Sequence, residues 1–209
     1  MAIIKSGILG GFSGKVANVV GSSWKGIAVM KSLPLSVANP RTALQVAHRN
    51  KFKRSVAFAL AILSVVIKPL WDRFAQGESG FNAFISKNIN LFGVGDLPSP
   101  LADLSISSGR MEKTEMSAHS KPSGTSLKLD WINDTGQGFK LEDDIPYVVV
   151  VNETTKQIQG YALTAKKRTD ITVTVTVPGN TASNLYSVYL SFRRADGTVV
   201  SNTAYRHIA

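Results

Sequence analysis

Residues 39–67 constrain the fold of this chain more than any other stretch; their sequence is NPRTALQVAHRNKFKRSVAFALAILSVVI. The stretch opens with the signals of a helix start, because Asn39 can cap a helix and Pro40 suits the first helical position. From residue 55 to residue 67 the sequence is apolar on every side of such a helix. A helix of that kind is buried, either by its own domain or by another copy of the protein. The sequence therefore predicts a long helix over 39–67 with a buried second half.

The first half of the same stretch is basic. Its cationic side chains recur at helical spacing over the first turns, and they are Arg41, Arg49, Lys51, Lys53 and Arg54. Like charges four residues apart repel each other, and positive charge near a helix N-terminus opposes the helix dipole. Since this placement costs stability, it favours contacts with phosphate groups or with an acidic partner, and a solvated helix start is the alternative.

The positive charge of the chain is concentrated in its first half. The formal net charge is +10. Residues 1–97 contain 12 Lys or Arg and 3 Asp or Glu, whereas residues 98–209 contain 12 and 11. This imbalance favours contact of the first half with nucleic acid, an anionic surface or an acidic partner, and general solvation by lysine is the competing interpretation.

The composition also limits the cellular setting. There is no cysteine, which excludes disulfides and thiolate chemistry. Residues 1–9 contain a single lysine and a short apolar run before glycines, so no secretion signal is recognised and synthesis in the cytoplasm is expected. The apolar run at 55–67 is 13 residues long. A bilayer span needs about 18–20, so a core or interface helix is favoured over a membrane helix.

The N-terminal segment predicts an apolar arm followed by a hairpin. Residues 1–14 are rich in glycine, but their spacing does not match a phosphate-binding loop, so a flexible arm that packs on another molecule is the better interpretation. Residues 15–33 predict two short strands around a turn at Lys25–Gly26. The candidate assembly contacts are Ile8, Leu9, Phe12 and Trp24. Together with the apolar half of the helix, they predict self-association.

A change of composition predicts the domain boundary. Pro69 is expected to kink or end the long helix, and residues 81–92 predict a second, shorter helix. The following sequence, GVGDLPSP at 93–100, has the composition of a linker. The predicted domains are a basic α+β assembly segment at 1–97 and a β domain at 98–209.

The second half of the chain predicts an all-β domain. Short runs with alternating polarity are separated by turn residues, most clearly in SLKLDW, TDITVTVTV and LYSVYLSF. The expected strands are 101–107, 126–132, 147–152, 157–164, 170–177, 185–193 and 198–205. Seven short strands indicate an antiparallel sandwich. The fold class is therefore α+β, with an N-terminal hairpin and helices followed by a C-terminal antiparallel sandwich.

Residues 101–209 resemble a fibronectin type III or related immunoglobulin-like module. The resemblance rests on Trp131 at the end of SLKLDW, on the run YVVVV, and on the Tyr-x-Val-x-Leu-x-Phe pattern at 186–192. It implies that Trp131 and either Tyr186 or Tyr189 are core residues. Such a fold says little about function.

The whole chain is similar to an uncharacterised family of proteins of roughly this length from Bacteroidota. The matching stretches are GILGGFSGKVANVVGSSWKGI at 7–27, NPRTALQVAHRNKF at 39–52 and GFNAFISKN at 80–88. A similar Asn-Pro-Arg-Thr…Gln…Arg…Phe pattern occurs in proteins encoded among phage and prophage structural genes. The resemblance implies a component of a particle or an assembly.

No catalytic or metal-binding motif is recognised. His48, His119 and His207 lie in separate segments without a carboxylate at ligand spacing. The acidic run 142–144 lacks the spaced oxygen ligands of a calcium loop and is interpreted as a solvated turn. The basic run 166–168 in a predicted loop is too short to separate anion contact from solvation. We therefore expect no enzyme activity, no cofactor, no metal and no small-molecule substrate.

Three functional hypotheses follow. The leading one is a non-enzymatic structural protein of a phage or phage-like particle, located in the assembled virion, whose partners are other copies or other particle proteins. The alternative is a nucleic-acid-binding protein that uses the basic start of the 39–67 helix. A surface adhesion module is a weaker alternative, which the missing secretion signal disfavours.

Overall fold

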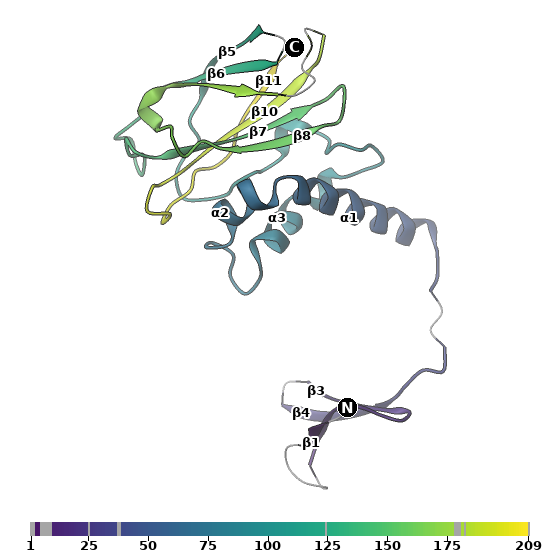
Figure 1. Ribbon diagram of the computed structural model, residues 1–209. Helices are drawn as coiled ribbons and strands as arrows, with labels where there is room; N and C mark the ends of the chain where they lie inside the picture. The colour runs from purple at the N-terminus through teal and green to yellow at the C-terminus, as the bar shows by residue number, and fades with distance from the viewer. Residues whose placement is uncertain are drawn as a thin grey trace. The chain divides into compact units, whose positions relative to one another are not determined.

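The computed structural model describes residues 3–4, 10–24, 26–36, 39–123, 125–177, 181 and 183–208. The chain divides into two compact units, Met1–Thr42 and Ala43–Ala209. We refer to them as unit 1 and unit 2 and describe each by itself (Figure 1). The division therefore lies between Thr42 and Ala43, and not at the linker-like sequence near residue 97.

Unit 1 is built on a four-stranded antiparallel sheet in the order β1-β2-β3-β4. Its strands are β1 (Ile3–Ile4), β2 (Phe12–Val16), β3 (Val19–Trp24) and β4 (Ile27–Ser32). In the turn between β3 and β4, Gly26 has a φ of 82°. This backbone conformation is costly for a residue with a Cβ atom, so glycine suits the position. The predicted hairpin around residues 25 and 26 is confirmed.

Unit 2 begins with the predicted helix in a shorter and broken form. The helix α1 spans Ala43–Ala61, a π-helical turn spans Leu63–Ile67, and α2 spans Lys68–Trp71. The expected helix start at residue 39 is wrong, because residues 39–42 are not helical.

The long helix breaks where Pro69 prevents regular continuation. Proline has no amide hydrogen, and its ring crowds the carbonyl group one turn earlier. The backbone rearranges before it, so that the amide of Ile67 donates to the carbonyl oxygen of Ile62 at 3.1 Å. The segments 43–61 and 63–71 are bent by 70°. Among the described residues no single helix has the length and apolar composition of a bilayer span, and only this bent pair has both when its two parts are taken together.

A second helix follows, close to its predicted position. The helix α3 spans Gly80–Asn88 and continues into a 3-10 turn at Ile89–Leu91. Ser79 caps it, because its hydroxyl oxygen accepts a hydrogen bond from the amide of Asn82.

The rest of unit 2 forms two antiparallel sheets with the orders β11-β10-β7-β8 and β5-β6-β9. Their strands are β5 (Met116–Ser123), β6 (Ser126–Trp131), β7 (Ile145–Asn152), β8 (Ile158–Ala162), β9 (Thr172–Thr176), β10 (Tyr186–Arg193) and β11 (Ala204–Ile208). The chain therefore combines a few helices with antiparallel sheets, in agreement with an α+β fold.

The larger sheet of unit 2 has an apolar core on each side. One core lies between the two sheets and includes Trp131, Val150 and Tyr186. The other lies between the helices and the larger sheet, and it includes Ile62, Phe84 and Tyr189 together with alternate residues of β7. Figure 1 shows the helices along one face of the larger sheet. Trp131, Tyr186 and Tyr189 are all buried, as the resemblance implied.

Buried hydrogen bonds explain why no division occurs near residue 97. The side-chain amide of Asn88 donates to the carbonyl oxygen of Ser105 and accepts from the amide of the same residue, at 3.0 and 2.9 Å. The indole of Trp71 donates to the carbonyl oxygen of Ile106 at 2.8 Å. These bonds join the helices to the segment that follows the linker-like sequence, so the helices belong to unit 2.

Two expected strands differ from the structure, and one observed strand was not expected. Residues 101–103 form a 3-10 turn instead of a strand. The strand β5 at 116–123 was not predicted, and β11 begins at residue 204, later than expected. The segment at 101–107 uses its apolar residues, Leu104 and Ile106, to fill the core between helices and sheet.

Candidate functional site

The two faces of the unit 1 sheet differ in charge. The register of β2, β3 and β4 places Val16, Gly21 and Met30 on one face. None of the side chains described on that face is charged, and they are Phe12, Val16, Val19, Ser23, Ala28, Met30 and Ser32. The opposite face carries Lys15 and Lys31, which both lie across from Val20. We call the first of these the uncharged face.

The residues that the structure describes in unit 1 form no apolar core. Among its residues with described side chains, only Gly21 is buried. The exposed fraction is 68% for Met30, 61% for Ile27 and 54% for Val16. A sheet is stable when a second layer covers its apolar side chains, and about 40 residues rarely supply such a layer alone. Unit 1 therefore presents apolar side chains that its own fold does not cover.

Two of the four predicted assembly contacts, Phe12 and Trp24, lie on strands of this sheet. Phe12 is half-buried on the uncharged face, and a Cβ atom at Gly21 would lie 2.5 Å from its ring, so the ring covers this glycine. Trp24 ends β3 and pairs with Ile27 through the backbone. Ile8 and Leu9 lie outside the described residues.

The first turns of α1 extend away from the core of unit 2. Every residue from 43 to 50 is exposed. Apolar side chains are among them, since Leu44 is 85% exposed and Phe52, slightly further along, is 50% exposed. This half of the helix therefore combines cationic and apolar side chains without a second layer.

The predicted basic residues do not form a single surface. Arg49 and Lys53 are one turn apart on one side of α1, whereas Lys51 and Arg54 lie on another side, because successive residues turn by about 100°. The Nη1 atom of Arg54 donates to the carbonyl oxygen of Gly93 at 2.6 Å. Arg41 is exposed and belongs to unit 1, whereas the other four residues belong to unit 2.

Within unit 2 the second half of the helix is buried on one side only, so its burial by another copy stays a prediction. Phe58 and Ile62 are buried in the core against the sheet, but Leu60 is 58% exposed. The helix is the outer layer of unit 2, so one of its sides has no neighbour in the unit.

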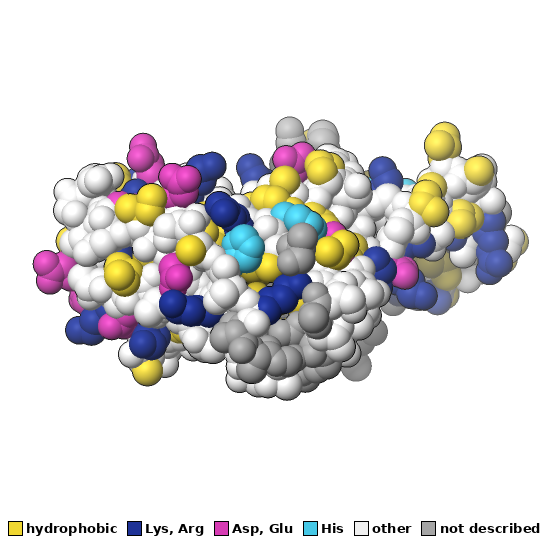
Figure 2. Space-filling model, turned by 90° about the horizontal axis from the view of Figure 1, so that it is seen from above, with side chains coloured by type: hydrophobic (Ala, Val, Ile, Leu, Met, Phe, Trp, Pro, Cys, Tyr) yellow, Lys and Arg dark blue, Asp and Glu magenta, His cyan; other side chains and the backbone are white. Residues whose placement is uncertain are grey.

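Charge is distributed differently in the later part of the chain. No Asp or Glu precedes Asp72, whereas ten Lys or Arg do. Figure 2 looks down on the region of β5 and β6, where acidic and basic side chains lie close together and hydrophobic areas are small. A surface of that kind is typical of a solvated domain.

The most elaborate polar arrangement in unit 2 is buried. Arg168 is fully buried; its Nη1 lies 2.6 Å from a carboxylate oxygen of Asp134, and its Nη2 lies 3.0 Å from one of Asp144. Its guanidinium carbon is 4.0 Å from the ring centre of Phe192. A buried charge is tolerated when it is paired and hydrogen-bonded, and Arg168 meets both conditions.

This ion network joins three loops. Lys140 donates to the second carboxylate oxygen of Asp134 at 2.6 Å, and the hydroxyl of Thr114 donates to the first at 3.3 Å. Burial alone raises the pKa of Asp134, but the hydrogen bond from Lys140 and the charge of Arg168 outweigh it and hold that pKa below its usual value. The indole of Trp131 donates to the carbonyl oxygen of Arg168 at 2.8 Å. The geometry indicates a structural role, because the charges satisfy one another inside the protein.

The sequence did not reveal this network, although both of its parts were noticed. The run 142–144 was interpreted as a solvated turn, and the run 166–168 was left open between anion contact and solvation. In the structure they meet through Asp144 and Arg168. Opposite charges in two predicted loops were the only signal, and nothing in the local sequence pairs them.

The histidines do not form a metal site in the described part of the chain. No group of three or more His, Asp or Glu residues there has the arrangement needed to hold an ion. His207 lies 3.0 Å from a carboxylate oxygen of Glu153. Burial lowers the pKa of His119, and the nearby charges of Arg206 and Lys121 lower it further.

The family of the chain follows from comparison with known proteins. A family model with the description "Family of unknown function (DUF6266)" matches residues 11–207. The chain belongs to this family. The match includes strands of both units, so the sheet of unit 1 and the two sheets of unit 2 belong to the same family match.

Other comparisons give little on function. No curated protein matches the chain. One similar solved structure is the fibronectin type-III domain of human fibronectin type III domain containing protein 3. It has 15% sequence identity and a TM-score of 0.32, and the match covers 49% of this chain and 88% of that one.

Proposed function

We propose that the chain is a non-enzymatic structural protein of a phage or phage-like particle. Unit 1 and the exposed start of α1 attach it to other copies or to other particle proteins. The two sheets of unit 2 form an immunoglobulin or fibronectin type III-like sandwich that is displayed or acts as a spacer. The chain is made in the cytoplasm and resides in the assembled particle.

One observation carries this proposal: unit 1 is a sheet with exposed apolar side chains whose described residues form no core, whereas unit 2 has two cores. Exposed apolar surface of this kind marks a protein interface more often than a solvated surface. The uncharged face suits a partner that brings apolar side chains of its own. The phage setting rests on the sequence pattern described above, and the absence of a recognised catalytic motif supports a structural role.

A matched pair of substitutions on β4 tests the attachment. Met30 lies on the uncharged face and Val29 on the face that carries lysines, and they are adjacent on the same edge strand. In cells that produce the particle, Met30→Lys is expected to reduce the amount of the chain that co-sediments with purified particles about tenfold or more, since burying such a side chain is worth about 1.5–3 kcal/mol. Val29→Lys is expected to have a much smaller effect.

Two results contradict the proposal. The first is that the wild-type chain stays in the soluble fraction when particles are separated on a density gradient. The second is that both variants enter particles as efficiently as the wild type. A thermal melt of unit 2 in each variant checks that its fold is intact.

Nucleic-acid binding is the second candidate, and the charge distribution favours it. The chain has no acidic residue before Asp72, and Arg49 and Lys53 share one side of α1. If four cations of α1 contact phosphates, the logarithm of the duplex DNA affinity should fall with the logarithm of salt concentration with a slope of roughly −3 to −4. The double variant Arg49→Gln, Lys53→Gln should make the slope shallower by about 2. Weak binding with a shallow slope would favour the structural role.

A further inference from the structure

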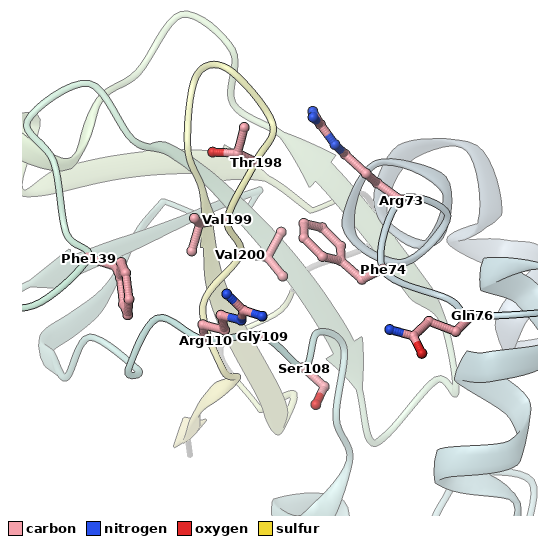
Figure 3. A pocket seen from close by; sticks show the side chains of 10 residues that line it. All are labelled: Arg73, Phe74, Gln76, Ser108, Gly109, Arg110, Phe139, Thr198, Val199 and Val200. Atoms are coloured by element: carbon pink, nitrogen blue, oxygen red, sulfur yellow. The ribbon is translucent and has the colours of Figure 1, made fainter.

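Unit 2 has a cleft where four separate segments meet (Figure 3). Its volume is about 490 Å³, within the range of roughly 300–1,000 Å³ that is usual for ligand pockets. The segments are the loop after α2, residues 108–110, the turn between β10 and β11, and the β6–β7 loop. None of them belongs to the uncharged face of unit 1.

Part of the cleft wall is apolar. Val200 is fully buried, and Phe74 and Val199 are half-buried. Phe139 is 50% exposed and contributes from the β6–β7 loop. Aromatic and branched side chains of this kind accept the apolar part of a ligand.

Two arginines from different segments line the same cleft. Arg73 follows α2, and Arg110 follows the 3-10 turn at 101–103. Figure 3 shows them with Phe74 and Val200 between them. One nitrogen of Arg73 donates to the backbone carbonyl of Asp196 at 3.2 Å, which leaves most of its five N–H donors for a ligand. Neither arginine forms an ion pair within the described ranges of the chain.

The backbone that carries Arg110 is held firmly in place. The amide of Met111 donates to the carbonyl oxygen of Val200, and the amide of Asn202 donates to that of Met111, at 3.1 and 2.9 Å. Gly109 lies directly against the backbone of Val200, because a Cβ atom at Gly109 would lie 2.1 Å from the carbonyl oxygen of Val200. A site on a fixed backbone loses little conformational entropy when it binds a ligand.

The wall formed by the β6–β7 loop is fixed in a similar way. Arg194 donates to the carbonyl oxygen of Phe139 at 3.0 Å. The next residue, Lys140, is tied to Asp134 in the buried ion network. The cleft is therefore already formed in the unbound protein.

We propose that this cleft binds an acidic peptide segment of a partner protein, with one carboxylate bound by Arg110, with Arg73 adding positive charge to the same cleft, and with a neighbouring apolar side chain against Phe74 and Phe139. The planar guanidinium group matches a carboxylate in a paired, two-bond geometry. The apolar walls exclude water from this contact and strengthen it.

The surroundings favour a single carboxylate over a polyanion. Asp196 lies in the same turn as Thr198, and its carboxylate accepts hydrogen bonds from the amide and the hydroxyl of Thr198 at 2.7 and 2.6 Å. These bonds lower its pKa, so it stays negative at neutral pH. A nucleic acid would bring many phosphates close to this charge, whereas a peptide brings one or two carboxylates.

The experiment uses the full chain and a dye-labelled peptide, acetyl-Phe-Glu-Leu-amide, measured by fluorescence anisotropy at low salt. The same peptide with Gln in place of Glu is the ligand control. The affinity of the neutral peptide is expected to be lower by about tenfold or more, because this peptide lacks the charge-assisted hydrogen bonds. Arg110→Gln should lower the affinity for the acidic peptide by a similar factor, Arg73→Gln should lower it by a smaller factor, and Phe139→Ala should lower the affinity for both peptides.

Arg49→Gln is the matched protein control, since it removes the same charge from α1 outside the cleft. It should leave peptide affinity unchanged. Equal binding of the acidic and neutral peptides would overturn the proposal, and so would an Arg110→Gln variant that melts normally and binds as well as the wild type. Arginine-dependent binding of a glucuronate disaccharide without binding of the peptide would also overturn it. Met30→Lys should leave peptide binding unchanged, which separates this outcome from the test of particle attachment.

Discussion

Unit 1 and unit 2 are both built on antiparallel sheets, but only unit 2 covers its apolar side chains. In unit 2 the larger sheet has a core on each side, so Val149 and Val150 are both buried although they point to opposite faces. In unit 1, Met30 and Val29 also point to opposite faces, and both are exposed. The same strand chemistry thus gives a complete domain in one case and an open surface in the other. The difference is the presence of further layers.

The largest expected effect concerns the ion network that unit 2 has and unit 1 lacks. Arg168→Met removes the buried cation that Asp134 and Asp144 share and leaves Asp144 unpaired, which is expected to cost about 3–5 kcal/mol of unfolding free energy. The nearby Lys167→Met removes an exposed charge and should cost less than about 0.5 kcal/mol. Urea denaturation followed by tryptophan fluorescence measures both. Equal stability of the two variants would show that the network does not hold unit 2 together.

The next effect tests the assignment of the helices to unit 2. Ile62→Ala removes a side chain from the core between helices and sheet, and about 2–5 kcal/mol of stability should be lost. Leu60→Ala changes a side chain that is 58% exposed, so less than about 1 kcal/mol is expected. Loss of the helical signal at 222 nm together with the β signal would support one cooperative unit. Separate transitions would instead place the boundary near residue 97.

A smaller effect should be confined to unit 1. Gly21→Ala would place a Cβ atom 2.3 Å from the carbonyl oxygen of Phe12, so the strands must shift, at a cost of about 1–3 kcal/mol. Gly93→Ala is the control in unit 2, because no atom lies within 4 Å of the added Cβ. Hydrogen exchange is expected to show faster exchange in β2 and β3 of the Gly21→Ala variant and unchanged exchange in unit 2. Slower exchange in unit 1 would contradict the close contact.

The smallest effect is the response of the two units to acid. Because the pKa of Asp134 is lowered in the folded state, its contribution to stability is present above the unfolded value near 3.8 and is lost as the pH falls through the folded value. Residues 1–42 contain no Asp, Glu or His, so no side chain of unit 1 makes a similar pH-dependent contribution to stability. Hydrogen exchange at pH 6 and pH 3, corrected for intrinsic rates, should show a loss of protection in unit 2 that is larger in the wild type than in Asp134→Asn. An equal pH response in both proteins would contradict the link to Asp134.

Local features of the fold could be predicted from the sequence. The turn at Gly26, the helix near 81–92 and the burial of Trp131 all follow from patterns within a few residues, and the structure contains them. The long helix and its kink before Pro69 were predicted, but the start of the helix was not. The break involves a π-helical turn before Pro69, whose form depends on how Ile67 packs in the core.

The division into units could not be predicted from composition. The sequence at 93–100 resembles a linker, yet the amide of Ser99 donates to the carbonyl oxygen of Leu91 at 2.8 Å, and Leu97 packs against the core. Glycine and proline are as frequent in a tight turn within a domain as in a linker. Only the contacts of Asn88 and Trp71 across this segment show that the chain continues in the same unit.

The candidate surfaces were predicted in part. The sequence identified the cations of α1 and the apolar N-terminal segment, but it did not show that Arg49 and Arg54 lie on different sides, or that one sheet face is uncharged. The cleft with Arg73 and Arg110 gave no sequence signal, because its residues come from four segments that are up to 127 positions apart.

The amino-acid sequence by itself determined where polar and apolar residues alternate, where turns form and how charge is divided along the chain, because these properties depend on near neighbours. Tertiary structure alone decided that Arg168 meets Asp144, that the helices cover β7 and β10, and that unit 1 is left without a second layer. Those outcomes depend on contacts between distant residues, for which packing and burial of the whole unit set the free energy. A strand such as β4 has the same local preferences in either setting, and its exposure is a property of what packs against it.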